Sequence, residues 1–153
     1  MTETAKHDER SYLGWAIAGV GILMIFYHLL SVWTPLFDAL LHQNVHLGFA
    51  FVLLFLVAMK QSEKWMRLLF GLALLASLAI VIYMHVEKDR LDMWAGFPEG
   101  LDVVIGIALV ALIFFLTWKS WGSVFPILVT ISVIYALFGH YIKGPLGHPE
   151  FDF

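Results

Sequence analysis

Histidines are the residues of this 153-residue chain whose type and spacing could do chemistry inside a membrane. Imidazole nitrogens that face each other at one depth can ligate a haem iron. Four histidines fall at one predicted depth, near the outer ends of the first, second, third and fifth apolar segments, namely His28, His46, His85 and His140. One hypothesis is therefore a haem-ligating membrane anchor subunit of a periplasmic oxidoreductase. We favour a simpler interpretation, in which each imidazole lies where a span meets water, with its apolar body buried and its polar tip solvated.

The segments that must position these histidines predict an all-α membrane protein with five transmembrane helices. Hydrophobic residues make up 61% of the chain and charged residues 14%, whereas soluble domains are about 45 to 50% apolar. The predicted spans are residues 12–33, 45–59, 68–84, 103–118 and 121–141. They form one membrane domain, 12–141, between an N-terminal tail, 1–11, and a C-terminal tail, 142–153.

The second, third and fourth predicted spans are short for a bilayer. At 1.5 Å per residue they cover only about 22 to 26 Å, against a hydrocarbon core of about 30 Å. We therefore expect these helices to extend into their polar flanks or to lean on a partner. The first apolar run, 12–33, is too long for a signal peptide and is followed by no small-residue cleavage pattern, so it predicts an uncleaved helix.

Lysine and arginine near the span ends predict the orientation, because these residues are retained on the cytoplasmic side. With a cytoplasmic N-terminus, the inner side carries Lys6, Arg10, Lys60, Lys64, Arg67 and Lys119. The outer side then carries only Lys88, Arg90 and Lys143. This bias predicts a cytoplasmic N-terminus and a periplasmic C-terminus.

The central turns of the predicted spans contain no lysine, arginine, aspartate or glutamate. An ionisable residue at mid-membrane would indicate an ion pathway or a proton relay, and the chain also has no cysteine to act as a nucleophile or thiolate ligand. We therefore expect no catalytic, substrate, metal or cofactor site in this chain, and we expect that it is not an enzyme.

The longest predicted outer segment, HVEKDRLDMWAGFPEGLD, combines acids with aromatic side chains. Such a loop could be simple solvated surface, or it could contact a soluble partner through complementary charge. The candidate contact residues are Glu87, Asp89, Asp92, Trp94 and Glu99. Asp102 follows at the start of the fourth span, where we favour a helix cap over a contact role because a carboxylate accepts the unpaired amides of a first turn.

Three stretches together resemble the small membrane portion of tripartite ATP-independent periplasmic (TRAP) transporters, and more narrowly the TAXI subgroup. They are NVHLGFAFVLLFLVAM, GFPEGLDVVIGIALVAL and SVFPILVTISVIYALFGHYIKGPLGH. The positions that match the subgroup's pattern are His46, Pro98, Asp102, Tyr135, Phe138 and Gly139. One departure is the end of the fourth helix, LTWKSWGS, where Lys119 stands in place of an acid and paired arginines.

The resemblance implies a small, non-catalytic subunit of a three-part importer in a bacterial inner membrane. In that family a periplasmic binding protein delivers substrate to a large subunit of roughly twelve spans, which carries it by an elevator movement. A sodium or proton gradient drives the large subunit by symport, and the small subunit braces it. The resemblance therefore implies three partners, namely the large subunit, the binding protein and membrane lipids. Because the chain ends at HPEFDF, we expect the small subunit to be a separate polypeptide.

Overall fold

The computed structural model describes residues 3–34, 37–94 and 97–149, with side chains from residue 12 onward. Within these ranges every regular element is a helix. The elements are α1 (Glu3–Trp33), α2 (Ala39–Gln61), α3 (Lys64–Val86), α4 (Lys88–Met93), α5 (Gly100–Trp121), α6 (Val124–Phe138) and the short 3-10 helix η1 (Gly139–Tyr141). Five of the helices are long and apolar enough to cross a bilayer, which confirms the predicted all-α, five-span fold.

The observed helices extend beyond the predicted apolar windows. α2 begins at Ala39 and α3 at Lys64, so each includes several polar flanking residues. The N-terminus of α2 is capped by Asp38, whose Oδ1 accepts the Leu41 N–H at 3.0 Å. Such a cap pairs one of the otherwise unsatisfied amides of a first turn, and it allows the polar stretch before the apolar window to be helical.

The predicted start of the fifth span at Trp121 is wrong, because Trp121 is the last residue of α5. Gly122 follows with a φ of 76°, and its N–H donates to the Trp118 carbonyl oxygen at 3.1 Å. A glycine in this left-handed conformation ends helices without the steric penalty of a side chain. The next helix therefore begins only at Val124.

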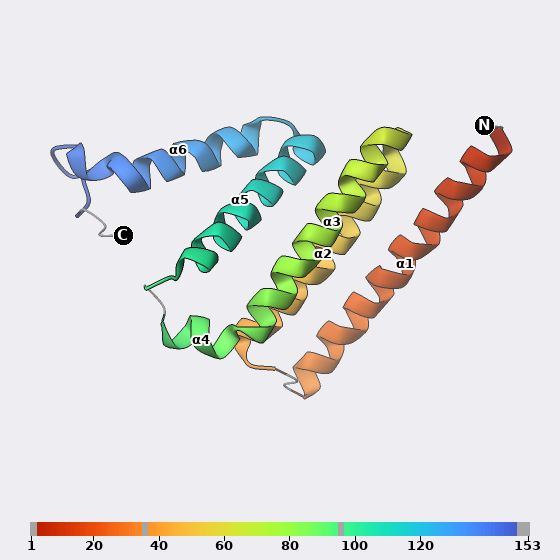
Figure 1. Cartoon of the computed structure of the whole chain (residues 1–153), viewed down its shortest axis with the longest axis horizontal. Helices are drawn as coiled ribbons and strands as arrows, with labels where there is room; N and C mark the ends of the chain where they lie inside the picture. The colour runs from red at the N-terminus through yellow and green to blue at the C-terminus, as the bar shows by residue number, and fades with distance from the viewer. Residues whose placement is uncertain (1–2, 35–36, 95–96, 150–153) are drawn as a thin grey trace. The chain divides into compact units, whose positions relative to one another are not determined.

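The chain divides into two compact units, residues 1–112 and 113–153, which we describe separately. In the first unit α2 contacts both α1 and α3, and the three helices lie side by side (Figure 1). Phe55 of α2 is fully buried, with ring centroids 6.1 Å from Phe51 and 6.3 Å from Phe70. Close approach depends on Gly48, since a Cβ there would lie 3.3 Å from Val81 Cγ1.

In the second unit the segment after α6 folds back onto the end of that helix. The Tyr135 hydroxyl donates to the Leu146 carbonyl oxygen at 2.6 Å, and a ring nitrogen of His148 lies 2.9 Å from the Tyr135 carbonyl oxygen. A Cβ at Gly139 would lie 2.6 Å from His148 Nε2, so only glycine fits beneath the imidazole. We call residues 139–149 the C-terminal hook.

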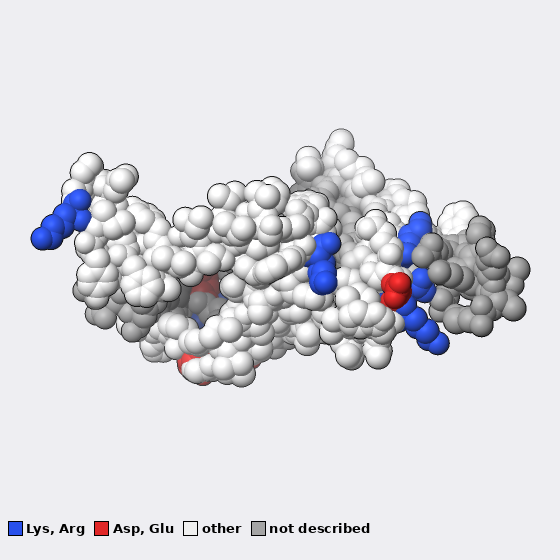
Figure 2. Space-filling model, turned by 90° about the horizontal axis from the view of Figure 1, so that it is seen from above, with Lys and Arg blue, Asp and Glu red and all other residues white. Residues whose placement is uncertain are grey.

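Apolar side chains cover much of the surface of the described spans. In the most apolar 18-residue stretch of each span at most 17% of the residues are buried, and in α1 none is. Most of the face shown in Figure 2 is uncharged, and its lysine, arginine and acidic side chains are confined to a few places, including one group at the right of the view. Surfaces of this kind are stable against lipid tails or against other membrane helices.

Candidate functional site

Polar side chains of the first unit gather where α1 and α3 end and α2 and α5 begin, and we call this region the α4 end. Its short helix lies between the end of α3 and the start of α5 (Figure 1). The sequence predicts a loop here, and that prediction is wrong for residues 88–93, which are helical. These six residues, KDRLDM, carry four charges and no apolar repeat, so the helix is held by ion pairs with its neighbours.

Arg90 of α4 is the centre of an ion-pair network, the Arg90 cluster, formed with Tyr83, Glu87, Glu99 and Asp102. Its guanidinium donates to Asp102 Oδ1 at 2.8 Å, to Asp102 Oδ2 at 3.0 Å and to Glu87 Oε2 at 2.7 Å. Glu99 Oε1 lies at 3.8 Å. The hydrogen bonds to Asp102 and then to Glu87 raise the pKa of Arg90 above its ordinary value. The cluster joins α3, α4 and α5 because its members come from all three helices or their ends.

Asp102 has more contacts than a helix cap requires. It is the third residue of α5, and Oδ2 accepts the Glu99 N–H at 2.9 Å, which caps the helix from within its first turn. Oδ1 also accepts the Tyr83 hydroxyl at 2.6 Å, and the side chain is only 8% exposed. With the two Arg90 contacts added, this carboxylate is a bidentate, largely enclosed partner for arginine.

Lys88 makes a second ion pair, which joins α4 to the start of α2. Its Nζ lies 2.8 Å from Asp38 Oδ2 and 3.3 Å from Asp89 Oδ1. The pKa of Asp38 is lowered, first by the Leu41 N–H and then by Lys88. The pKa of Lys88 is raised, first by its hydrogen bond to Asp38 and then by that to Asp89. Both shifts favour the charged pair at neutral pH.

The five candidate contact residues lie close together along the chain on and around α4, but they are not equally available. Glu87 forms a close ion pair with Arg90. The Asp89 side chain, in contrast, is 94% exposed, and that of Glu99 is 74% exposed. Trp94 is 58% exposed. Two neighbouring apolar side chains, Met93 at 78% and Phe97 at 77%, extend this exposed surface. Aromatic and methionine side chains are enriched in protein interfaces, and exposed acids around them can attract a partner of opposite charge.

Two of the four candidate histidines meet in the first unit. His28 Nε2 and His46 Nδ1 are 2.9 Å apart, and His28 Nδ1 lies 2.7 Å from the Met24 carbonyl oxygen. Because the carbonyl can only accept, Nδ1 of His28 carries a proton, and in the neutral ring Nε2 then accepts from His46 Nδ1–H. His42 Nδ1 also lies 3.0 Å from the Tyr27 hydroxyl of α1, with the two rings stacked. These contacts join α1 to α2.

This geometry does not suit the haem hypothesis for His28 and His46. Two axial nitrogens on one iron must be roughly 4 Å apart, twice a metal–nitrogen bond of about 2.0 to 2.1 Å. The ring of His85 packs edge-on against Phe37 with a centroid distance of 5.7 Å, and His140 belongs to the second unit. Among the described residues, no group of three or more histidines and acids is placed to hold a metal ion.

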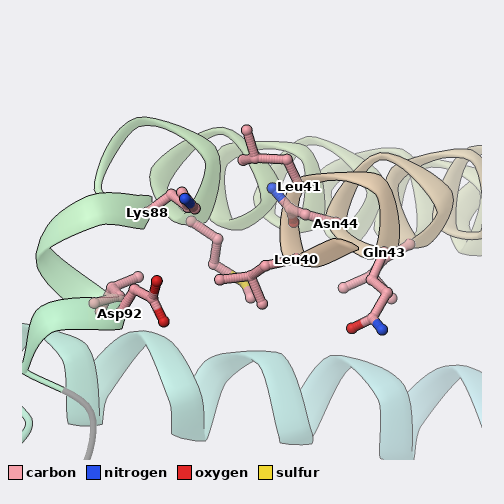
Figure 3. Close-up of a pocket in the computed structure, with 9 residues that line it drawn as sticks. Leu40, Leu41, Gln43, Asn44, Lys88 and Asp92 are labelled. Atoms are coloured by element: carbon pink, nitrogen blue, oxygen red, sulfur yellow. The ribbon is translucent and has the colours of Figure 1, made fainter. Parts of the chain in front are cut away.

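A pocket of about 440 Å³ opens at the α4 end between α2, α3 and α4 (Figure 3). Its lining is Leu40, Leu41, Gln43, Asn44, Leu47, Met84, Lys88, Leu91 and Asp92. Asn44 is only 6% exposed, and its Nδ2 donates to the Val81 carbonyl oxygen at 2.9 Å. Its Oδ1 is buried and accepts no hydrogen bond from any residue that the structure describes. A buried acceptor without a donor costs about 1 to 3 kcal/mol.

Sequence reasoning missed the partners that organise this region. Arg90 and Lys88 were counted only for orientation, although each joins α4 to another helix. Their spacing to acids within α4 was a visible signal, but the contacts to Asp38 and Asp102 cross long sequence separations. Asn44, a polar residue at the start of an apolar run, was a visible signal of a buried polar site.

Comparisons with protein-family models, curated proteins and solved structures found no match to this chain.

Proposed function

We propose that this chain is the small, non-catalytic membrane subunit of a secondary-active importer of the TRAP type, in the TAXI subgroup. It lies in a bacterial inner membrane with its N-terminus in the cytoplasm and its C-terminus in the periplasm. Its task is to brace a large elevator-type subunit, which carries the substrate and uses the sodium or proton gradient. The proposal rests on the resemblance of its sequence to that family.

One observation supports a bracing role above the others. The described spans combine extensive exposed apolar surface with an absence of ionic groups from their central turns. A helix bundle of this kind can pack against another membrane protein, but it offers no charged pathway of its own for an ion. The substrate and coupling-ion sites are therefore expected on the partner subunit.

The α4 end is proposed as the surface that meets the periplasmic binding protein. Asp89 and Glu99 supply exposed negative charge, and Met93, Trp94 and Phe97 supply exposed apolar area. The Arg90 cluster fixes the helix that presents them. A rigid surface of this composition suits a soluble partner with basic residues around an apolar patch.

Purification of the tagged chain from native membranes in mild detergent tests the bracing role. We expect a membrane protein of roughly twelve spans to co-purify, together with a soluble periplasmic protein. Substrate uptake by proteoliposomes that contain this chain as their sole membrane protein would contradict the proposal. The same preparation tests the haem alternative, since a Soret band that follows the chain through purification would replace the transporter assignment.

Charge reversal tests the docking surface separately. In nanodiscs that hold the assembled membrane subunits, Asp89→Lys is expected to slow capture of the binding protein and to reduce its salt dependence. Glu63→Lys, at the opposite end of α3, is the matched control. Equal capture by Asp89→Lys and wild type would exclude this surface while leaving the bracing role intact.

A further inference from the structure

We propose that the pocket between α2, α3 and α4 binds a primary ammonium group attached to an apolar chain, with the ethanolamine headgroup of a membrane phospholipid as its natural source. This site does not depend on the transporter assignment, since it is argued only from side chains of the first unit.

The pocket is apolar along most of its wall. Leu40, Leu41 and Leu47 come from α2, Met84 from α3 and Leu91 from α4. Its volume of about 440 Å³ is within the range of small-molecule sites, which is about 300 to 1,000 Å³. Methionine adapts its shape readily to an occupant. This wall suits the first part of a hydrocarbon chain.

The polar groups of the pocket need a donor. Asn44 Oδ1 accepts nothing from the described residues, and Asp92 forms no ion pair with any of them. Figure 3 shows Lys88 and Asp92 extending from α4 toward Leu40, Leu41 and Asn44 of α2. The Lys88 ammonium is already held by Asp38 and Asp89. Asp92 is an exposed acceptor, and Asn44 Oδ1 becomes a second one when a lining side chain moves aside. A cationic N–H donor complements both of them.

The depth of the pocket in the membrane favours a lipid as the source. Ion-paired Asp38 and Lys88 lie at this end of the helices, and the exposed indoles of Trp33 and Trp94 belong to the same end. Tryptophan rings are enriched at the level of lipid headgroups. An ethanolamine phospholipid would place its ammonium near Asp92, and its phosphate could accept the remaining Lys88 N–H.

Asn44 distinguishes an ethanolamine lipid from a choline lipid. A trimethylammonium group has the same charge as an ammonium group but no N–H to donate. It can be attracted by Asp92, yet it cannot satisfy Asn44 Oδ1. The Oδ1 atom has less than 1 Å² of accessible surface, so a donor reaches it only when a side chain of the pocket lining moves aside.

The experiment uses the full chain, together with any membrane subunits that co-purify. Equimolar dioleoyl phosphatidylethanolamine and dioleoyl phosphatidylcholine are added after delipidation, and bound lipid is counted by native mass spectrometry. We expect about a tenfold preference for the ethanolamine lipid, as for one charge-assisted hydrogen bond. In a second arm without lipid, decylammonium and decyltrimethylammonium are compared by thermal shift, which separates a soluble amine from a lipid as the source.

Variants of the lining residues test whether the preference for the ethanolamine lipid arises in this pocket. Asn44→Leu and Asp92→Asn should each lower it to about one, whereas Gln61→Leu and Glu63→Gln, matched changes at the far ends of α2 and α3, should leave it unchanged. Leu91→Trp fills the pocket without touching its polar groups, so it should abolish retention even if Asn44→Leu folds poorly.

Two kinds of result would overturn the proposal. Equal retention of both lipids with equal shifts from both amines would mean that the pocket holds only water or an unspecific acyl chain. A preference that survives both Asn44→Leu and Leu91→Trp would come from another surface. A shift with decylammonium and no lipid preference would support the ammonium chemistry and assign it to a soluble amine.

Discussion

At the scale of single residues, His148 holds the C-terminal hook in a way that depends on its charge. One ring nitrogen lies 2.9 Å from the Tyr135 carbonyl oxygen, and the other lies 2.6 Å from that of Pro149. Both acceptors lack a proton, so the two bonds form together only with the doubly protonated imidazolium. These bonds, that to Tyr135 first, raise the pKa of His148 above its ordinary value of 6.5.

A raised pKa gives the hook a defined dependence on pH. Its stabilisation by His148 is complete below pH 6.5 and is lost as the pH rises through the folded-state pKa. We expect backbone amide NMR signals of residues 139–149 in micelles to report an opening of the hook between neutral and alkaline pH. The His148→Gln variant should show the open signals throughout, and a transition that persists in that variant would assign it to another group, such as neighbouring His140.

Gly48 is a residue-scale test of the packing between α2 and α3. A leucine there would drive its side chain into Val81, 3.3 Å from the position of a Cβ, and overpacking of this kind costs about 1 to 3 kcal/mol. We expect Gly48→Leu to lower the midpoint of unfolding in detergent mixtures, followed by circular dichroism. Gly21→Leu on α1, where a Cβ meets nothing within 4 Å, is the matched control. Equal midpoints for the two variants would show that this contact is unimportant.

At the scale of elements, α4 depends on Arg90 more than on its own helix propensity. A six-residue helix is too short to be stable alone, and Arg90 is its bidentate link to Asp102 of α5. We expect Arg90→Gln to increase hydrogen exchange across residues 88–93 while the amides in the middle of α2 stay protected. Arg90→Lys should rescue little, because an ammonium cannot reproduce the two parallel bonds. Full protection in Arg90→Gln would assign the stability of α4 to Lys88 instead.

The helices also differ in how far the sequence could predict them. Five spans were predictable because apolar runs of this length have few other uses in a protein. The helix ends were not, since Asp38 and Gly122 fix them through single local contacts that an apolar window does not register. α4 was missed because its bonds to Asp38 and Asp102 cross 50 and 12 positions of sequence.

For the candidate site residues, too, the sequence indicated which side chains could matter but not how they pair. The depth of His28 and His46 could be inferred from their place in the apolar runs, but their 2.9 Å contact depends on how α1 and α2 are rotated about their axes. The acids around α4 were found by composition, whereas their pairing was not. Glu87 is bound closely by Arg90, whereas Asp89 and Glu99 stay largely exposed although each lies within 4 Å of a cation. Asn44 alone is visible in the sequence as a polar residue at the start of an apolar run, but the pocket around it is lined by three helices, so its other residues could not be inferred from a local pattern.

At the scale of the whole molecule, the orientation in the membrane can be tested directly because the chain has no cysteine of its own. Each single-cysteine variant therefore reports on one site. We expect Asp89→Cys, on exposed α4, to react with a membrane-impermeant maleimide added to spheroplasts. Gln61→Cys, at the other end of α2, should react only after the membrane is permeabilised. The asymmetry follows from the excess of lysine and arginine at the Gln61 end.

The reverse pattern of labelling would do more than invert the topology. It would place Asp89, Trp94 and Glu99 in the cytoplasm, out of reach of any periplasmic binding protein, and so remove the docking proposal. It would leave the bracing role intact, since apolar helix faces pack equally well in either orientation. It would also leave the ammonium pocket intact, because ethanolamine headgroups can approach from either leaflet. Labelling therefore isolates the one part of the functional proposal that depends on which side of the membrane α4 occupies.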